Sequence, residues 1–299
     1  MEKLITRRDL LKKTAAIAVG GSVLLNFPLK SFAWGTQAAA KSKVVLIRNE
    51  KLFANGDQPD PAIAAQMLDE ALCTLTGKSN AQTAWASIIK PTDIVGIKTN
   101  EWDKFPTPPV VNNILKERVL QVGVKEENVS VKDRGILDDP VFQNSTALIN
   151  VRPMRTHAWA GVGTCIKNFI MFSNNRPSYH DDSCASLATL HELPIVKGKA
   201  RLHVLVLFTP TFHHRTAQDI SPEYQWKYCG LVAGFDPVAV DSVGLRIVQA
   251  KRNAFFGEDK PLNPPAKHIE LADTRYHLGN ADPVKIDLIK LGWDSESFV

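Results

Sequence analysis

The chain has 299 residues, of which 44% are hydrophobic and 22% charged, values typical of a globular protein with a substantial core. Its formal net charge is +5, but residues 1–33 hold six of the basic residues and only two of the acidic ones. The remainder is nearly balanced and carries no basic stripe, which argues against a nucleic-acid-binding protein.

Residues 1–33 have the layout of an export signal. The charged stretch "TRRDLLKK" precedes the uncharged, mostly apolar run "TAAIAVGGSVLLNF", and small residues follow ahead of Trp34. The pair Arg7 and Arg8 resembles a twin-arginine signal, which predicts the twin-arginine export machinery as a partner and a periplasmic or otherwise exported protein. An uncleaved amphipathic anchor helix is the alternative. No later apolar run is long enough to span a membrane, so we expect residues 34–299 to form a mature protein that does not cross one.

Downstream of the leader, strand patterns alternate with helix patterns. Short β-branched or apolar runs predict strands, and apolar residues three and four apart predict helices. In chain order, the predicted strands are 43–48, 93–100, 128–133, 147–153, 202–208, 229–235 and 285–291, and the predicted helices are 62–76, 108–123, 237–252 and one after the proline-rich break at 261–265. This order predicts a single α/β domain with a layered, mostly parallel sheet flanked by helices.

Polar groups follow three of the predicted strands. They are the groups at 98–100, at 133–134 and at 152–157. Because ligands of open α/β sheets bind beyond the carboxyl ends of the strands, these groups predict a ligand site. We expect Lys98 and Asn100 to belong to it, with ordinary solvated loop residues as the alternative.

Five motifs resemble, in order and approximate spacing, the family known as domain of unknown function 362: "GIKTN", "VKDRG", "RTHAWAGVGTCIKN", "GFDPVAVDSVG" and "HLGNADPVKIDLI". They extend over most of residues 43–291. The resemblance implies an α/β domain, and in the exported branch a twin-arginine leader, without specifying an activity. Some members carry a ferredoxin-like iron–sulfur module, whose cysteine run is missing here. The family's usual acidic "IVDG" strand end is also missing from "VLVLFTPTFHH".

The segment "RTHAWAGVGTCIKNFI" (155–170) is the strongest candidate for the site. Gly161 and Gly163 could let backbone N–H groups approach a phosphate or carboxylate, with Lys167 supplying charge and Asn168 a polar contact. The spacing is neither that of a P-loop nor that of a dinucleotide-binding fingerprint. A small anionic molecule is therefore a better prediction than a nucleotide.

A second interpretation makes this segment a metal or cofactor site. His157, Lys167 and His180 resemble the layout of the nickel-pincer lactate racemase family, which implies a lysine that tethers a cofactor and histidines that bind metal or move protons. Imidazole suits transition metals, and a buried lysine with a lowered pKa can act as a nucleophile. The cofactor's identity stays open, but four widely spaced cysteines without a C-x-x-C pair argue against an iron–sulfur cluster.

A purely structural interpretation also stays open for this segment. The histidine could bond a backbone carbonyl, the glycines could form a turn, and the lysine could be solvated. In "FDPVAVDSVG", Asp236 and Pro237 are typical of a helix start. Asp241 would then be a buried carboxylate partnered by Lys98 or Lys167, or else an exposed helix acid.

Together these features predict an exported α/β enzyme or cofactor protein with a small anionic ligand or metal site, which could be redox-linked. The expected catalytic groups are His157, Lys167 and His180, with the same two histidines as metal ligands. The expected cofactor-binding residues are Lys98, Asn100, Gly161, Gly163, Asn168 and Asp241. The alternative is a non-catalytic periplasmic accessory or binding protein that holds a metal or a redox partner.

Overall fold

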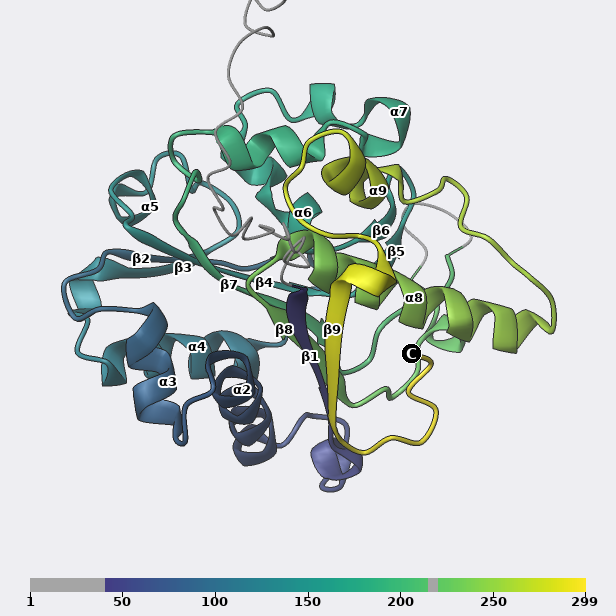
Figure 1. Ribbon diagram of the computed structural model, residues 1–299, viewed down its shortest axis with the longest axis horizontal. Coiled ribbons are helices and arrows are strands. Elements are labelled where there is room, and N and C mark those ends of the chain that lie inside the picture. Colours follow the sequence, from purple (N-terminus) through teal and green to yellow (C-terminus); the bar gives the residue numbers. More distant parts are fainter. Residues whose placement is uncertain (1–40, 215–219) are drawn as a thin grey trace, which may run out of the picture. The chain divides into compact units, whose positions relative to one another are not determined.

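The computed structural model describes residues 41–214 and 220–299, and the predicted export signal lies outside them. Within these ranges, one seven-stranded sheet has the strand order β3-β2-β4-β7-β8-β1-β9 (Figure 1). The strands are β1 (Ser42–Arg48), β2 (Val95–Lys98), β3 (Val129–Lys132), β4 (Ala147–Pro153), β7 (Ala200–Leu207), β8 (Gly230–Gly234) and β9 (Ile286–Gly292). The predicted α/β fold with a layered, mostly parallel sheet is confirmed.

One strand breaks the parallel pattern. Pairing is parallel between β2 and β3, β2 and β4, β4 and β7, and β1 and β9, whereas β8 runs antiparallel to both β7 and β1. The continuous apolar composition of β8 marks it as buried but contains no information on its direction.

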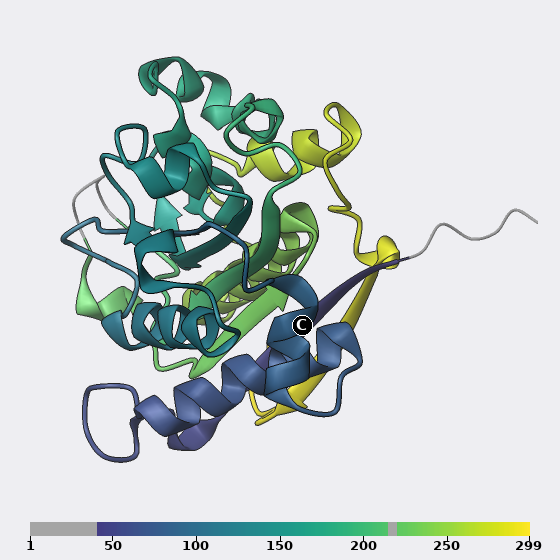
Figure 2. The ribbon, with the colours of Figure 1, turned by 90° about the vertical axis from the view of Figure 1, so that its left-hand side faces the viewer.

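Helices cover both faces of the sheet (Figures 1 and 2). One face packs against α2 (Pro61–Thr76), α3 (Ala81–Ile88) and α4 (Pro109–Gln121), and the other against α6 (Cys165–Asn168), α8 (Pro237–Phe256) and α9 (Lys267–Thr274). Alternate residues of β1 show the division, since Val45 joins the first core and Val44 the second. Two cores therefore lie on opposite faces of the sheet, as the period of a strand requires.

Capping residues define the main helices. Asp60 and Asp236 accept hydrogen bonds from backbone N–H groups at the starts of α2 and α8. Gly77 and Gly257, with φ of 68° and 70°, end the same two helices in the left-handed conformation that glycine adopts without strain. Helix α8 therefore continues to Phe256, four residues beyond its predicted end at Arg252.

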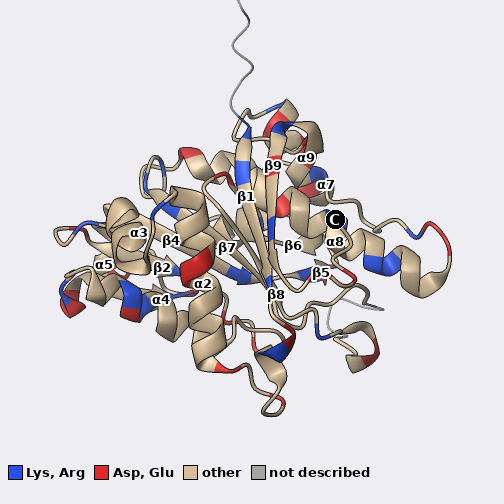
Figure 3. Ribbon diagram, turned by 60° about the horizontal axis from the view of Figure 1, so that its bottom comes forward, with Lys and Arg blue, Asp and Glu red and all other residues tan. Residues whose placement is uncertain are grey.

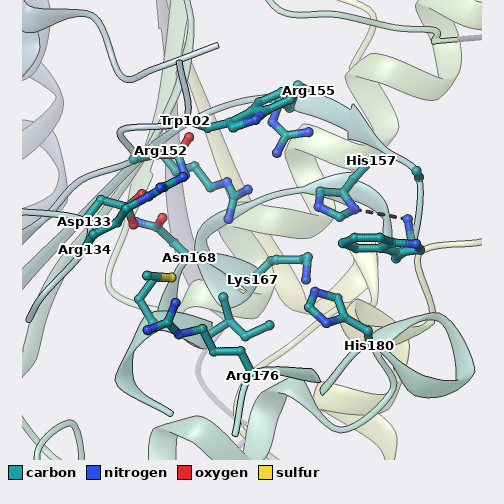
Figure 4. Close-up of a pocket in the computed structure, with 15 residues that line it drawn as sticks. Trp102, Asp133, Arg134, Arg152, Arg155, His157, Lys167, Asn168, Arg176 and His180 are labelled. Carbon is teal, nitrogen blue, oxygen red and sulfur yellow. Dashed lines mark hydrogen bonds between the residues drawn. The ribbon is translucent and has the colours of Figure 1, made fainter. Parts of the chain in front are cut away.

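The segment 155–170 forms an unexpected hairpin. Strands β5 (Arg155–His157) and β6 (Gly161–Gly163) pair antiparallel as a separate two-stranded sheet, and α6 follows directly. The hairpin reverses the direction of the chain, and the side chains of His157 and Lys167 lie close together as a result (Figure 4).

No helix within the described ranges is both long and apolar enough to cross a membrane. Acidic and basic residues alternate along the described helices and loops instead of separating onto different elements (Figure 3).

Candidate functional site

A cavity of about 420 Å³ lies where β2, β3 and β4 end (Figure 4). Its walls come from the loops after β2 and β3, from β4 and the β5–β6 hairpin, from α6 and from the segment that precedes α7 (Asp181–Cys184). Among the predicted site residues, those that line it are Asn100, His157, Lys167, Asn168 and His180. Those that do not line it are Lys98, Gly161, Gly163 and Asp241. The carboxyl edge of the sheet is thus the place where most of the predicted site residues meet.

The charge of the cavity is strongly one-sided. Its cationic side chains are Arg134, Arg152, Arg155, Lys167 and Arg176. The acidic side chain that lines it is Asp133, which Lys98 already engages. A ligand in this cavity would meet an excess of positive charge.

Lys98 and Asp133 form a saturated ion pair at the base of the site. The Lys98 ammonium is fully buried, lies 2.5 Å from Asp133 Oδ1, and also donates to the Thr99 carbonyl at 2.6 Å and to Asn168 Oδ1 at 3.3 Å. Burial lowers the pKa of Lys98 to about 8, against the opposing effect of Asp133. Burial would raise the pKa of Asp133, but the Lys98 ammonium outweighs it and brings that pKa below its ordinary value. The pair stays charged and supports the cavity from behind.

Asn168 connects this base to the sheet. Its side-chain amide donates to Asn150 Oδ1 at 2.8 Å and to the carbonyls of Lys98 and Val151 at 3.1 Å. Asn150 in turn donates to the Cys165 carbonyl at 2.8 Å. These bonds tie α6 to β2 and β4, so the side chains of α6 are held in fixed positions relative to the strand ends.

The remaining wall holds buried cations with donors that lack acceptors. Arg152, Arg155 and Lys167 are 4%, 7% and 3% exposed. Within the described part of the chain, the Nε atoms of both arginines and the Nζ atom of Lys167 have no hydrogen-bond partner. Burial lowers the pKa of both arginines, yet a guanidinium stays charged in a protein. Since an unpaired buried charge is strongly unfavourable, this wall is suited to anionic oxygens of a ligand.

An aromatic ring holds Arg155 in place. Its guanidinium lies 4.1 Å from the centroid of the Trp102 ring and donates one N–H group to the Thr156 carbonyl at 3.2 Å (Figure 4). Cation–π stacking fixes the plane of the guanidinium without neutralising it. Arg155 therefore keeps its charge and its other N–H groups for the cavity.

Lys167 is the most reactive cation of the wall. Burial lowers its pKa to about 8, with Arg152 and Arg155 lowering it further and Cys184 acting in the opposite direction. Burial also raises the pKa of the Cys184 thiol, which is therefore neutral near pH 7 and leaves the lysine charge uncompensated. The lowered pKa gives Lys167 a larger share of neutral amine near pH 7 than an exposed lysine has.

Two histidines flank the Lys167 amine (Figure 4). Burial lowers the pKa of His157 well below its ordinary value, and Arg155 and Lys167 lower it further. Its Nδ1 atom accepts a hydrogen bond from the Trp159 backbone at 3.1 Å, which places the proton of the neutral ring on Nε2. Burial also lowers the pKa of His180, whose ring meets the Trp159 ring edge-on at a centroid distance of 4.6 Å. Both imidazoles are neutral near pH 7.

The metal interpretation receives less support from the geometry. In residues 41–214 and 220–299, no group of three or more histidine, cysteine or acidic side chains is placed to hold a metal ion. His157 and His180 supply two imidazoles beside Lys167, so the residues fit a covalent handle better than a complete metal site. The four cysteines, Cys73, Cys165, Cys184 and Cys229, are all free thiols.

Asp241 has a different partner from either lysine that the sequence proposed. It is fully buried on α8, and its two oxygens accept hydrogen bonds from the backbone N–H groups of Cys165 and Ile166, each at 2.8 Å. Burial raises the pKa of Asp241 to about 7, opposed by bonds from Thr164 and these backbone groups. Asp241 thus anchors the first turn of α6 and does not contact a ligand in the cavity.

The two glycines serve the structure of the hairpin. A Cβ atom on Gly161, whose φ is 71°, would lie 2.6 Å from the Pro264 carbonyl oxygen. A Cβ atom on Gly163 would lie 3.0 Å from Arg152 Nη2. The close approach predicted for these glycines therefore involves the 264–266 backbone and the Arg152 guanidinium rather than a ligand. Gly163 makes room for one of the cavity's cations.

Several residues of the cavity were not assigned to the site from the sequence. They are Trp102, Trp159 and Arg176, whereas Arg134, Arg152 and Arg155 belong to the polar groups at 133–134 and 152–157 that predicted a site, although they were not named among its expected residues. Arg152 and Arg155 lie at or just after the end of a buried strand, and this position in the sequence indicates a place in the ligand site. Arg176 lies in an irregular segment, where no periodic pattern indicates the direction of a side chain.

The fold and the cavity define an α/β protein with a cationic site at the carboxyl edge of its sheet. The model of the family described as Domain of unknown function (DUF362) matches residues 110–246, a range that contains the β5–β6 hairpin and α6. The chain therefore carries a domain of this family, as its motifs predicted. No curated protein and no solved structure matches the chain.

Proposed function

We propose that this protein is an exported enzyme that binds a small anionic substrate in the cavity at the carboxyl edge of its sheet. One observation carries the proposal: Arg152, Arg155 and Lys167 are buried there without acceptors for all their donors. Carboxylate and phosphate oxygens are the groups that would complete these hydrogen bonds.

The size of the cavity limits the ligand. A volume of about 420 Å³ lies in the range of sites for small molecules and cofactors. The two buried arginines favour a planar anion such as a carboxylate, or a phosphate, because a guanidinium binds two oxygens at once. Arg134 and Arg176 are exposed at the cavity and add to the attraction of anions from solution.

Catalysis is favoured over simple binding by the groups that surround the ligand space. Lys167, with a pKa near 8, and the neutral ring of His180 can exchange protons close to physiological pH, and His157 can donate a hydrogen bond from Nε2. A protein that only holds an anion has no need for such groups. Turnover of a bound anion is the observation that separates an enzyme from a binding protein.

Calorimetric titration of the full chain with phosphate, citrate and 2-oxoglutarate tests the anion site. We expect saturable binding of at least one of them, and at least tenfold weaker binding by Lys167→Met, which keeps most of the apolar stem. Lys116→Met, which removes a partly exposed ammonium from α4, is the matched control and should bind normally. Failure of all three anions to bind, or equal affinity in both variants, would refute the proposal.

The export part of the proposal rests on the leader alone. Changing Arg7 and Arg8 together to lysine should leave the protein unprocessed in the cytoplasm, because the twin-arginine route depends on that pair. Normal appearance of the mature form outside the cytoplasm would contradict it. Cell fractionation followed by intact mass measurement gives both readouts.

A second candidate is a cofactor protein with a group tethered to Lys167. The position of this amine between two imidazoles favours it, since a lysine handle and flanking histidines are the elements that the racemase resemblance implies (Figure 4). Intact mass and metal analysis of protein recovered from its native export route would test it. An added mass on Lys167 together with bound metal supports this candidate, and an unmodified chain without metal excludes it.

A further inference from the structure

Lys167 has the environment of a nucleophilic amine. Its Nζ atom lies in the cavity wall, is buried, and has no nitrogen or oxygen acceptor in the described part of the chain, with the neutral Cys184 thiol as the neighbour that favours its charged form. The guanidinium groups of Arg152 and Arg155 belong to the same cavity, and neither brings a counter-ion to the lysine. An amine crowded by cations and removed from water loses its proton more readily than an exposed lysine.

Lys98 provides the contrast within the same site. Its ammonium is equally buried but donates to a carboxylate, a carbonyl and an amide oxygen. These acceptors hold all three donor positions of the ammonium and favour its charged form. Of the two buried lysines at this edge of the sheet, Lys167 is the one with a free amine directed into the cavity.

We propose that Lys167 forms a Schiff base with a small carbonyl compound that also carries a carboxylate, a 2-oxo acid being the simplest case. This inference rests on the proposed function, since the arginines that bind the anion also position its carbonyl carbon. A carboxylate held by Arg152 or Arg155 would keep the adjacent carbonyl within the same cavity as the Lys167 amine.

The step balances with groups that are present. The lone pair of neutral Lys167 attacks the carbonyl carbon, a C–N bond forms as the C=O π bond breaks, and the first nitrogen proton passes to the oxygen to give a neutral carbinolamine. The second nitrogen proton then passes to the hydroxyl, the C–O bond breaks, and water leaves as the C=N bond forms. His180, neutral and beside the amine, can accept each nitrogen proton and return it to the oxygen, while the Nε2–H group of His157 can donate a hydrogen bond to that oxygen. No oxidant or reductant takes part.

The cationic wall also favours the product of this step. A Schiff base of a 2-oxo acid keeps its carboxylate next to the former carbonyl carbon, where it can pair with a guanidinium. A neutral ketone or ester lacks this anchor and would have to react without being positioned. Selectivity for the acid over its ester is therefore a direct consequence of the geometry.

Reductive trapping tests the inference on the full chain. The protein is incubated at pH 8 with pyruvate, oxaloacetate or 2-oxoglutarate in the presence of sodium cyanoborohydride, and modified peptides are located by mass spectrometry. We expect one adduct per chain, on Lys167, with at least one of these acids. Methyl pyruvate, the matched neutral carbonyl, should label Lys167 at least tenfold less than pyruvate does, and Lys116→Met should label like the unmodified chain.

The outcomes separate the two proposals. Saturable binding of these acids without an adduct on Lys167 would overturn the Schiff base and leave the anion site intact. No binding of any anion would overturn both. Labelling that is equal in Lys167→Met, or that maps to other lysines in the unmodified chain, would show ordinary surface reactivity and would also overturn the inference. Because the peptide map of the unmodified chain locates the adduct, the test holds even if Lys167→Met fails to fold.

Discussion

Buried cations at the base of the cavity have all their hydrogen-bond donors satisfied, whereas those in the remaining wall do not. At the base, the ammonium of Lys98 meets Asp133 and two further acceptors, and the pair is closed to other partners. On the wall, Lys167, Arg152 and Arg155 are just as buried but have donors without acceptors. Saturated charge at the base maintains the structure of the site, whereas unsaturated charge on the wall indicates where a ligand belongs.

The largest effect on stability should come from removing one partner of the buried Lys98–Asp133 ion pair. Lys98→Met removes the ammonium and leaves Asp133 buried without its counter-ion, so we expect the free energy of unfolding to fall by about 3–5 kcal/mol. Urea denaturation followed by circular dichroism measures the change. Adding Asp133→Leu to this variant should restore part of the lost stability. A loss below about 1 kcal/mol in Lys98→Met alone would show that Asp133 does not depend on Lys98 as its counter-ion.

The stability that Lys167 contributes should depend on pH. The folded pKa of Lys167, about 8, is below the ordinary value of 10.5, so the unfolded chain binds more protons between these values. Stability contributed by this residue should therefore rise as the pH increases from 8 to 10.5, by up to about 1.4 kcal/mol per pH unit, while below pH 8 the full cost of the buried charge remains.

The measurement is the difference in unfolding free energy between the unmodified chain and Lys167→Met across this pH range. The subtraction removes the parallel contribution of Lys98, which both proteins share. A difference that does not change with pH would mean that Lys167 is not buried as a cation.

The smallest effects are expected from two glycine variants, one of which should change mainly the unfolding free energy and the other mainly the affinity for anions. Gly161→Ala meets the Pro264 backbone and requires a left-handed φ, so it should lower the unfolding free energy by about 1–3 kcal/mol. Gly163→Ala meets the end of the flexible Arg152 side chain and should cost less than about 1 kcal/mol, yet weaken anion binding severalfold by displacing the guanidinium. Thermal unfolding and calorimetric titration of both variants give the two readouts, and unchanged anion binding by Gly163→Ala would contradict a connection between Gly163 and the site.

The strands and long helices were predictable because their signals are local. The β-branched run of β1, the cap at Asp60 and the glycine that ends α2 are each visible in a few neighbouring residues. The reversed direction of β8, the eight-residue helix α3 and the hairpin at 155–163 depend on long-range pairing or on short signals, and they were not predicted. At the site, positions after strands indicated Asn100 and His157, whereas the partner of Asp241 could be identified only after α8 was packed against α6.

The stability of Lys167→Met with and without an anion tests the central claim most directly. Without ligand at pH 7, removing an uncompensated buried charge should make the variant more stable than the unmodified chain, by on the order of 1–3 kcal/mol. At a hundred times its dissociation constant, the tightest-binding anion of the panel should stabilise the unmodified chain by about 2.7 kcal/mol and the variant by much less, so that the difference between them narrows or reverses. A variant that is less stable without the anion, and that gains as much from it as the unmodified chain, would contradict the claim that the unsaturated wall is an anion site.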